Sequence, residues 1–290
     1  MAQFRPDGLG WVPDRPDFRD LNYDSKKVCE LLPRIASAEK TATVTGRSEI
    51  DLPREAHDQG ALQSSCAFAC VSLIEYGERL AKRRSTQNRS RLFVYSMARR
   101  VDGQCGDSGA SIRSTLKAIR RFGAPPEQLW PYDPARVNEE PHPPAIYAYN
   151  RDFASLNYFR LDRRSHSGQQ TLDVVRSFLD AQYPIVFGFA LPTSVSTESP
   201  DIDFNLTQDG TIGGQVVLAT GYDNNRKMAS GIPGALQIQH SWGNRWGDQE
   251  GTGWLSYRFI LQGFAHDFWT AVTPAWLAAG VFESLSVPDY

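Results

Sequence analysis

The stretch HSWGNRWGDQEGTGWLSY, residues 240–257, decides the fold. Short runs of aromatic and β-branched residues are bounded here by glycines, a pattern typical of strands joined by tight turns. Four stretches that precede or overlap it share the pattern, so the second half of the chain is predicted to form a sheet. The predicted strands cover residues 185–191, 213–223, 234–242 and 251–260.

The first half of the chain has the period of helices. Residues 64–82 are apolar nearly all round until Glu78, which predicts a buried helix with Ser64 as its N-cap. Residues 109–122 carry an apolar stripe that ends at Gly123, a typical C-terminal stop. A third helix is predicted at about 171–182. Helices followed by strands indicate an α+β fold, in two lobes.

Composition excludes several classes of function. The chain has 290 residues and a net charge of −2 with interspersed signs, which predicts neither nucleic acid nor a membrane as partner. No apolar run approaches the roughly 20 residues that span a bilayer, and the polar, proline-rich start is no secretory signal. Four cysteines form no zinc or redox motif, so no cofactor or metal is expected and the protein is placed in the cytoplasm with free thiols.

Four segments, in order, resemble the papain family of cysteine peptidases, most closely its bacterial branch without a long propeptide. They are DQGALQSSCAFA at 58–69, the stretch 102–133, GGQVVLATGYD at 213–223 and the block at 240–257. The resemblance implies an α+β fold in which a cleft separates a helical lobe from a β-barrel-like lobe.

The expected division of the chain follows from this frame. Residues 1–50 are taken as an irregular N-terminal extension and connector, 51–150 as the helical lobe, 151–275 as the β-rich lobe, and 276–290 as a C-terminal tail.

The resemblance also assigns the catalytic positions, and none holds the family's residue. The nucleophile stands six residues after the oxyanion glutamine and directly before x-Ala-Phe, so Gln59 puts Ser65, not Cys66, in its place. The residue after Gly-Gly, where the family has histidine, is Gln215. The residue before Ser-Trp-Gly, where it has asparagine, is His240. Cysteine, histidine and asparagine are thus replaced by serine, glutamine and histidine.

Other family positions around the cleft complete the candidate site. Trp242 and Trp246 match the aromatic pair that covers the third catalytic position, and Ser64, Cys66 and Gly214 flank the site as supporting residues. Cys66 is expected to point away from the cleft, because a helix turns about 100° per residue. The family's usual disulfide is not expected, since Leu62 stands where the partner of Cys105 would be.

These exchanges predict a loss of chemistry. A serine hydroxyl needs a base, and an amide at position 215 neither takes nor releases protons near neutral pH. Simpler interpretations remain open: Ser65 is an ordinary helix-start residue, and Gln215 and His240 form a satisfied polar pair under Trp242. The other histidines are interpreted as surface or loop residues, and Cys66 with Cys70 as small core residues.

Three functions follow from this reading. The first is an inactive papain-like homologue that binds a peptide or protein segment in the cleft as an accessory or regulatory protein. The second is a hydrolase with a rewired site, in which Ser65 is the nucleophile, His240 the base and Gln59 the oxyanion donor. The third is a structural subunit whose aromatic stretch 268–285 docks on a partner or on its own body. The sequence does not fix the oligomeric state.

Overall fold

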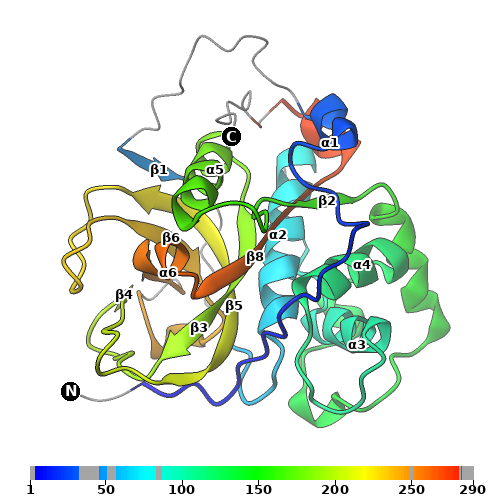
Figure 1. Ribbon diagram of the computed structural model, residues 1–290. Coiled ribbons are helices and arrows are strands. Elements are labelled where there is room, and N and C mark those ends of the chain that lie inside the picture. Colours follow the sequence, from blue (N-terminus) through cyan, green and yellow to red (C-terminus); the bar gives the residue numbers. More distant parts are fainter. Residues whose placement is uncertain are drawn as a thin grey trace.

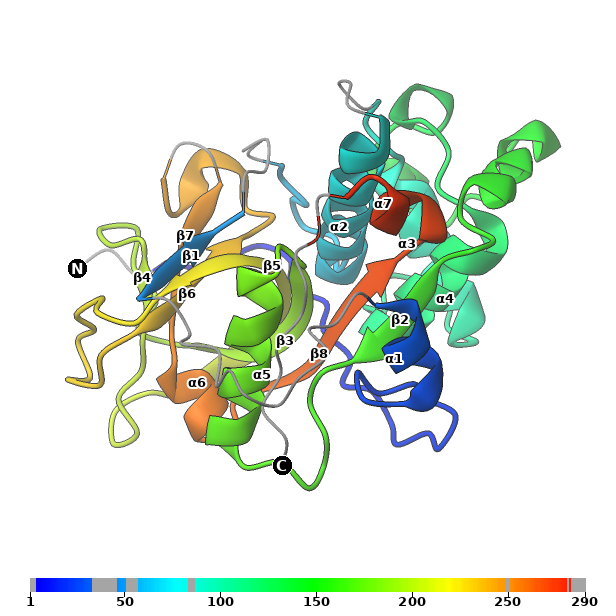
Figure 2. The ribbon, with the colours of Figure 1, turned by 90° about the horizontal axis from the view of Figure 1, so that it is seen from above.

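The computed structural model describes residues 4–32, 46–50, 57–82, 87–248, 251–280 and 282. Helices α2, α3 and α4 gather on one side of the molecule, and the sheet lies on the other together with α5 and α6; the long helix α2 lies next to the sheet (Figure 1, Figure 2). This is the α+β, two-lobe arrangement predicted from the sequence.

The helical lobe is built on three helices, α2 (Ser65–Lys82), α3 (Arg91–Val101) and α4 (Ile112–Phe122). The hydroxyl of Ser111 accepts a hydrogen bond from the third residue of α4, and Gly123 ends that helix with a φ of 84°, as the sequence predicts. The sequence does not predict α3, whose start is fixed by Ser90 in the same way. Nearly all of α3 is buried, so it lacks the polar face that marks an amphipathic helix.

Four further helices lie outside this group. The longest, α5, begins with a reciprocal capping box between Ser167 and Gln170 and covers the predicted third helix. The others are single turns or little more. The bounds are α1 (Lys26–Leu31), α5 (Gly168–Asp180), α6 (Arg258–Leu261) and α7 (Pro274–Ala278).

The described strands form one mixed sheet that is not closed into a barrel, which is consistent with the predicted α+β, two-lobe fold. Along its main path the order is β2-β8-β3-β5-β6-β7-β4, and β1 pairs with β5. Every pairing is antiparallel except that of β4 with β7. The strands are β1 (Arg47–Glu49), β2 (Asn157–Arg160), β3 (Ile185–Pro192), β4 (Asp201–Ile202), β5 (Thr211–Asp223), β6 (Ala235–Gln239), β7 (Thr252–Ser256) and β8 (Ala265–Val272).

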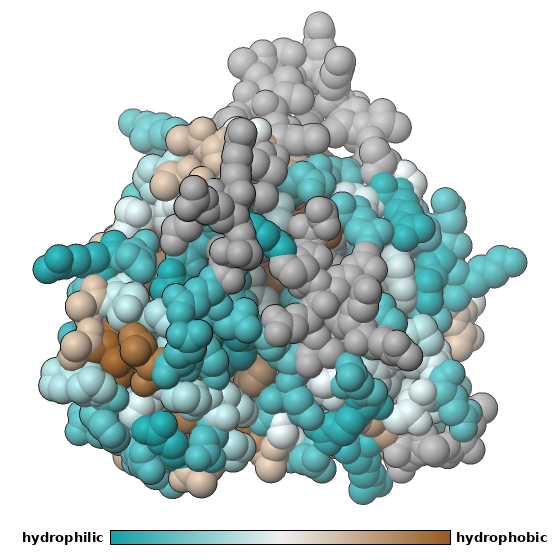
Figure 3. Space-filling view, turned by 180° about the vertical axis from the view of Figure 1, so that it is seen from behind, coloured by the Kyte–Doolittle hydropathy of each residue, from teal (hydrophilic) through white to brown (hydrophobic). Residues whose placement is uncertain are grey.

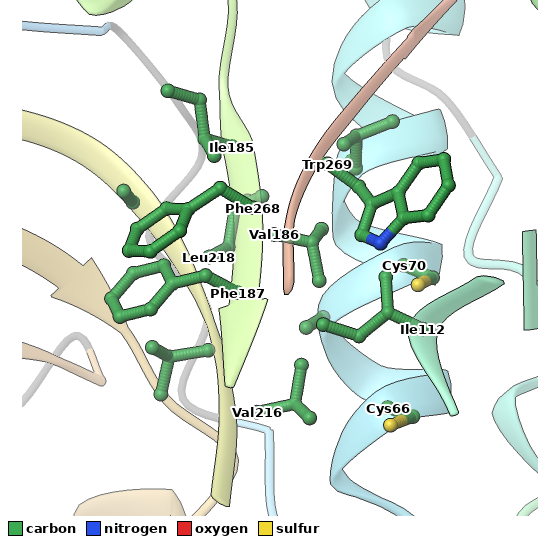
Figure 4. Packing of buried hydrophobic residues seen from close by; sticks show 14 of the residues in the cluster. Cys66, Cys70, Ile112, Ile185, Val186, Phe187, Val216, Leu218, Phe268 and Trp269 are labelled. Atoms are coloured by element: carbon green, nitrogen blue, oxygen red, sulfur yellow. The ribbon is translucent and has the colours of Figure 1, made fainter. Parts of the chain in front are cut away.

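The core joins the sheet to α2. On the sheet, the rings of Phe187 and Phe268 stack with centroids 4.8 Å apart. Val216 of β5 lies on the side of the sheet toward α2, which carries Cys66 and Cys70 (Figure 4). Phe187 and Phe268 point away from α2, whereas Val216, Cys66 and Cys70 are buried between the sheet and the helix, so the apolar area that these three remove from water helps to hold the two together.

Two predicted strands are shorter than expected. The fourth ends at Ser256, because its hydroxyl accepts from the backbone N–H of Arg258 and α6 begins there. The predicted strand 234–242 ends at Gln239. After it, the backbone N–H of Trp242 donates to Nδ1 of the His240 ring, which turns the chain out of the strand.

Both ends of the described chain are built into the body. The N-terminal stretch, predicted to be irregular, contains α1 and adds Phe4, Tyr23 and Val28 to the buried core. At the other end, residues 268–272 belong to β8, which the sequence did not predict. Trp276 packs against Gly77 of α2, so this aromatic stretch docks on its own molecule.

The surface agrees with the composition. Among the described helices, none is both long and apolar enough to cross a membrane. The face opposite to Figure 1 is mostly hydrophilic where it is described, with small separate hydrophobic areas (Figure 3).

The close contact of α7 with α2 gives a first prediction. A Cβ added at Gly77 would overlap the indole of Trp276, so Gly77→Ala is expected to lower the free energy of unfolding by about 1–3 kcal/mol. Urea unfolding measures this. Gly210→Ala is the control, because the nearest atom to its added Cβ is 3.6 Å away. Equal loss in both variants would contradict the proposed packing.

Candidate active-site cleft

The first turn of α2 presents the residue that the sequence aligned with the nucleophile. Ser65 is the first residue of the helix and is wholly buried. Its backbone N–H, which has no partner inside a helix, donates to the carbonyl oxygen of Leu9 at 3.3 Å. Its hydroxyl accepts from the backbone N–H of Val216 on β5, at 3.3 Å. Ser65 therefore joins α2 both to the sheet and to a segment from the N-terminus.

Gln59 supplies a second donor to the same carbonyl. Its side-chain amide nitrogen, Nε2, donates to the Leu9 oxygen at 2.8 Å and to the Leu62 oxygen at 2.7 Å. The backbone N–H of Gln59 donates to the carbonyl of Ser241, which fixes the loop before α2 against the sheet lobe. Two donors thus converge on one main-chain oxygen, the geometry that stabilises an oxyanion in acyl transfer.

Gln215 bonds to Gln59, not to His240. Its Nε2 donates to Gln59 Oε1 at 3.1 Å and contacts Ser241 Oγ at 3.2 Å, while Ser241 Oγ donates to Gln59 Oε1 at 2.5 Å. The polar pair of Gln215 with His240 that the sequence suggested is wrong. An amide nitrogen finds an acceptor in the oxygen of Gln59, and this three-residue network holds the Gln59 side chain in its orientation.

His240 is enclosed by the tryptophan pair, as the sequence predicts. Its ring stacks on Trp242 at 5.2 Å between centroids and meets Trp246 edge-on at 5.0 Å. Nδ1 accepts from the backbone N–H of Trp242, so the proton of the neutral ring is on Nε2. Nε2 is buried and has no hydrogen-bond partner among the described residues. Burial lowers the pKa of His240 to about 4, although the charge of Asp248 raises it in part.

Cys66 is turned toward the helical lobe. Its thiol donates to the carbonyl of Ala110 at 2.7 Å and lies 3.8 Å from the carbonyl of Gly10. Burial raises the pKa of this thiol well above its usual value. Among the described residues, the acceptors of the Cys66 thiol are backbone carbonyl oxygens, and no imidazole accepts from it. Figure 4 shows Cys66 and Cys70 on α2 beside Ile112.

The remaining predicted residues have structural partners. Ser64 stands directly before α2, and its hydroxyl bonds to the Tyr132 hydroxyl at 2.7 Å. Leu62 is buried, and Cys105 is an exposed free thiol. No group of three or more possible metal ligands occurs in the part of the chain that the structure describes.

An N-terminal segment, residues 8–14, lies where the resemblance puts the cleft, and we call it the resident segment. The backbone N–H groups of Gly10 and Trp11 donate to the Gly214 carbonyl of β5, at 3.2 and 3.1 Å. On the other side, Ala110 donates to the Gly10 carbonyl at 3.1 Å and accepts from Val12 at 3.2 Å. In Figure 1 this blue segment passes from the sheet lobe, below α2, to the helical lobe.

Trp11 anchors the resident segment by its side chain. The indole lies over Gly188 and Gly214, two positions without a Cβ. Its Nε1–H donates to Asp267 Oδ2 at 3.1 Å, and the same oxygen accepts from the backbone N–H of Asp14 at 2.9 Å. Asp267 is buried and is held by Arg160 at 3.0 Å.

The sequence analysis missed these partners. No repeated pattern in the sequence includes Leu9, Gly10, Trp11 and Asp267. The available hint was the pair of glycines, Gly8 and Gly10, just before Trp11. Gly214 was predicted as a supporting residue, and its carbonyl receives two of the segment's N–H groups.

Comparison with known proteins gives a consistent set of similarities. The chain is 28% identical over 276 residues to an uncharacterized peptidase C1-like protein of Acanthamoeba polyphaga mimivirus, covering 90% of this chain and 85% of that protein. Xylellain, a cysteine protease from Xylella fastidiosa, superimposes with a TM-score of 0.73 at 28% identity over 94% of this chain and 99% of its own. No protein-family model matches the sequence.

A more distant similarity concerns the fold alone. The digestive procathepsin L 3 of Tenebrio molitor larval midgut has a TM-score of 0.56 at 17% identity, over 92% of this chain and 75% of its own.

The burial of His240 gives a prediction on pH. Since its folded pKa of about 4 lies below the usual 6.5, the unfolded state takes up a proton first as the pH falls. Stability is therefore full above pH 6.5 and declines as the pH falls toward 4, by about 3 kcal/mol from this group.

His240→Gln is expected to remove most of that decline, because a glutamine carries no titrating group. The measurement is the free energy of unfolding in urea at pH 7 and at pH 4.5. His142→Gln, at an exposed histidine, is the matched control. An unchanged pH dependence in His240→Gln would refute the assignment of a buried neutral ring.

Proposed function

We propose that this chain is a non-hydrolytic member of the papain-like cysteine peptidases, and that it holds an extended peptide segment in its cleft as an accessory or regulatory protein. The observation that carries the proposal is the Leu9 carbonyl, which accepts from both the Ser65 N–H and Gln59 Nε2. These donors bind an intact main-chain carbonyl. Binding of the ground state holds a peptide without lowering the barrier to its cleavage.

Among the described residues no base bonds to the Ser65 hydroxyl, which supports the same proposal. Ser65 Oγ accepts from the Val216 N–H, and the amide of Gln215, at the family's base position, bonds to Gln59 and Ser241. His240 bonds by its Nδ1 to the Trp242 backbone. The described contacts therefore give the Ser65 proton no acceptor side chain, and losing a triad member costs several orders of magnitude in rate.

The free protein does not offer an open groove, contrary to the first expectation for peptide binding. The resident segment fills the cleft with main-chain bonds to both lobes. A partner peptide therefore binds in trans only when it displaces residues 8–14, and the segment acts as a competitor at high effective concentration. This property suits a regulated adaptor, whose binding depends on the release of its own segment.

The test is labelling with a serine-directed fluorophosphonate, in the wild-type chain and in Trp11→Ala, which loosens the resident segment. We expect no labelling at Ser65 in either chain, because no base activates the hydroxyl. Trp11→Ala with Ser65→Cys is the access control: iodoacetamide labelling of the new thiol at position 65, identified by mass spectrometry, shows that reagents reach the site.

Labelling of Ser65 that is lost in Ser65→Ala would overturn the proposal and favour the rewired hydrolase. In that case His240→Gln distinguishes the roles further, since it would abolish labelling only if the imidazole is the base.

A further inference from the structure

We infer that the cleft is selective for one peptide pattern, Gly-Leu-Gly-Trp followed by an aspartate three residues after the tryptophan. The inference rests on the proposed function and specifies its partner: an extended segment of another polypeptide that carries the pattern of residues 8–14. The requirement at each position is inferred from the contacts that the same residue of the resident segment makes with the cleft.

The two glycines are required by close backbone approach. A Cβ on Gly10 would overlap the backbone of Gln63, and Gly10 has a φ of 124°, which side-chain-bearing residues rarely adopt. A Cβ on Gly8 would overlap the Leu62 carbonyl. Both neighbours belong to the loop that leads into α2, so they cannot rotate away as a flexible side chain would. Any larger residue at either position is therefore excluded.

The tryptophan is required by both shape and a hydrogen bond. Its indole fills the space left by Gly188 and Gly214, where a Cβ on Gly214 would lie 2.9 Å from the ring. Its N–H reaches Asp267, a carboxylate that is only 3% exposed. Phenylalanine would fill part of the space but remove one of the two donors to Asp267 Oδ2, so that this buried oxygen would keep only the Asp14 N–H.

The leucine contributes in two ways. Its side chain lies against Gly213, while its carbonyl takes the two donors from Ser65 and Gln59. Its backbone N–H donates to Gln63 Oε1 at 3.2 Å. The main-chain bonds supply affinity for any residue, and the side-chain contact favours an aliphatic one.

The aspartate fixes the end of the pattern. Its carboxylate accepts from the Trp269 indole at 2.8 Å, and its backbone N–H shares Asp267 Oδ2 with the Trp11 indole. Asp14 therefore couples the end of the segment to the same buried group that holds the tryptophan.

The experiment measures binding in trans to the full chain carrying Trp11→Ala. The probe is a 12-residue peptide with the sequence of residues 4–15, FRPDGLGWVPDR. Isothermal titration is expected to show binding of this peptide to Trp11→Ala and none to the wild-type chain, whose own segment occupies the site. Peptides with Gly10→Ala or Trp11→Phe are expected to bind at least tenfold more weakly.

The matched control is the peptide with Val12→Ala, since the Val12 residue is 41% exposed and only its backbone is bonded; it should bind like the parent. Equal binding of all four peptides would overturn the selectivity and leave the proposed function standing. No binding of any peptide, with hydrogen exchange showing residues 4–15 released in Trp11→Ala, would overturn both.

A second measurement covers the case in which Trp11→Ala fails to fold. Hydrogen exchange in the full chain is expected to become faster at residues 8–12 in Gly10→Ala and to stay unchanged in Gly231→Ala, where φ is 79° and nothing lies within 4 Å of the added Cβ. Unchanged protection in Gly10→Ala would contradict the requirement for glycine.

Discussion

The free N–H at the start of α2 is the constraint on which the rest of the site depends. A buried helix start must find an acceptor for its first backbone donors, because no helix residue supplies one. In an active peptidase of this fold a substrate carbonyl is expected there; in this chain the Leu9 carbonyl takes the place, joined by the Gln59 amide. Removing the segment would leave both donors to water, so the helix start, the loop before it and the N-terminal segment stabilise one another.

Glycine makes this arrangement possible on both sides of the contact. Gly10 approaches the backbone of Gln63, and the Trp11 indole approaches Gly188 and Gly214. A side chain at any of these positions would push the segment away and lengthen its main-chain bonds. Close contacts at glycine positions therefore orient the segment, and the indole bond to Asp267 helps to fix its register.

The frame of the fold could be predicted from the sequence because it depends on local pattern and spacing, and the same spacing assigns Ser65, Gln215 and His240 to the family's catalytic positions. The helix at 64–82 and the tryptophans beside His240 are such cases. The hydrogen-bond partner of Gln215 could not be predicted from the sequence, because an amide can bond to several neighbours and only the arrangement in space selects Gln59. The resident segment was missed for a similar reason: its partners Gln63, Gly188 and Asp267 are far apart in sequence, and no period connects them.

The exchanges at the three catalytic positions make physical sense together. On the proposed function the bound carbonyl is held and not cleaved, so a base at position 215 would have no proton to move, whereas an amide there supports Gln59 in its donor orientation. Position 240 then no longer orients a catalytic ring and becomes a packing position, where a neutral imidazole fits between Trp242 and Trp246. Such a ring is stable in the dry interior only while uncharged, which is why burial depresses its pKa. On the proposed function, the frame that positions a nucleophile in an enzyme here holds residues 8–14, through the Ser65 N–H and the Gln59 amide that Gln215 supports.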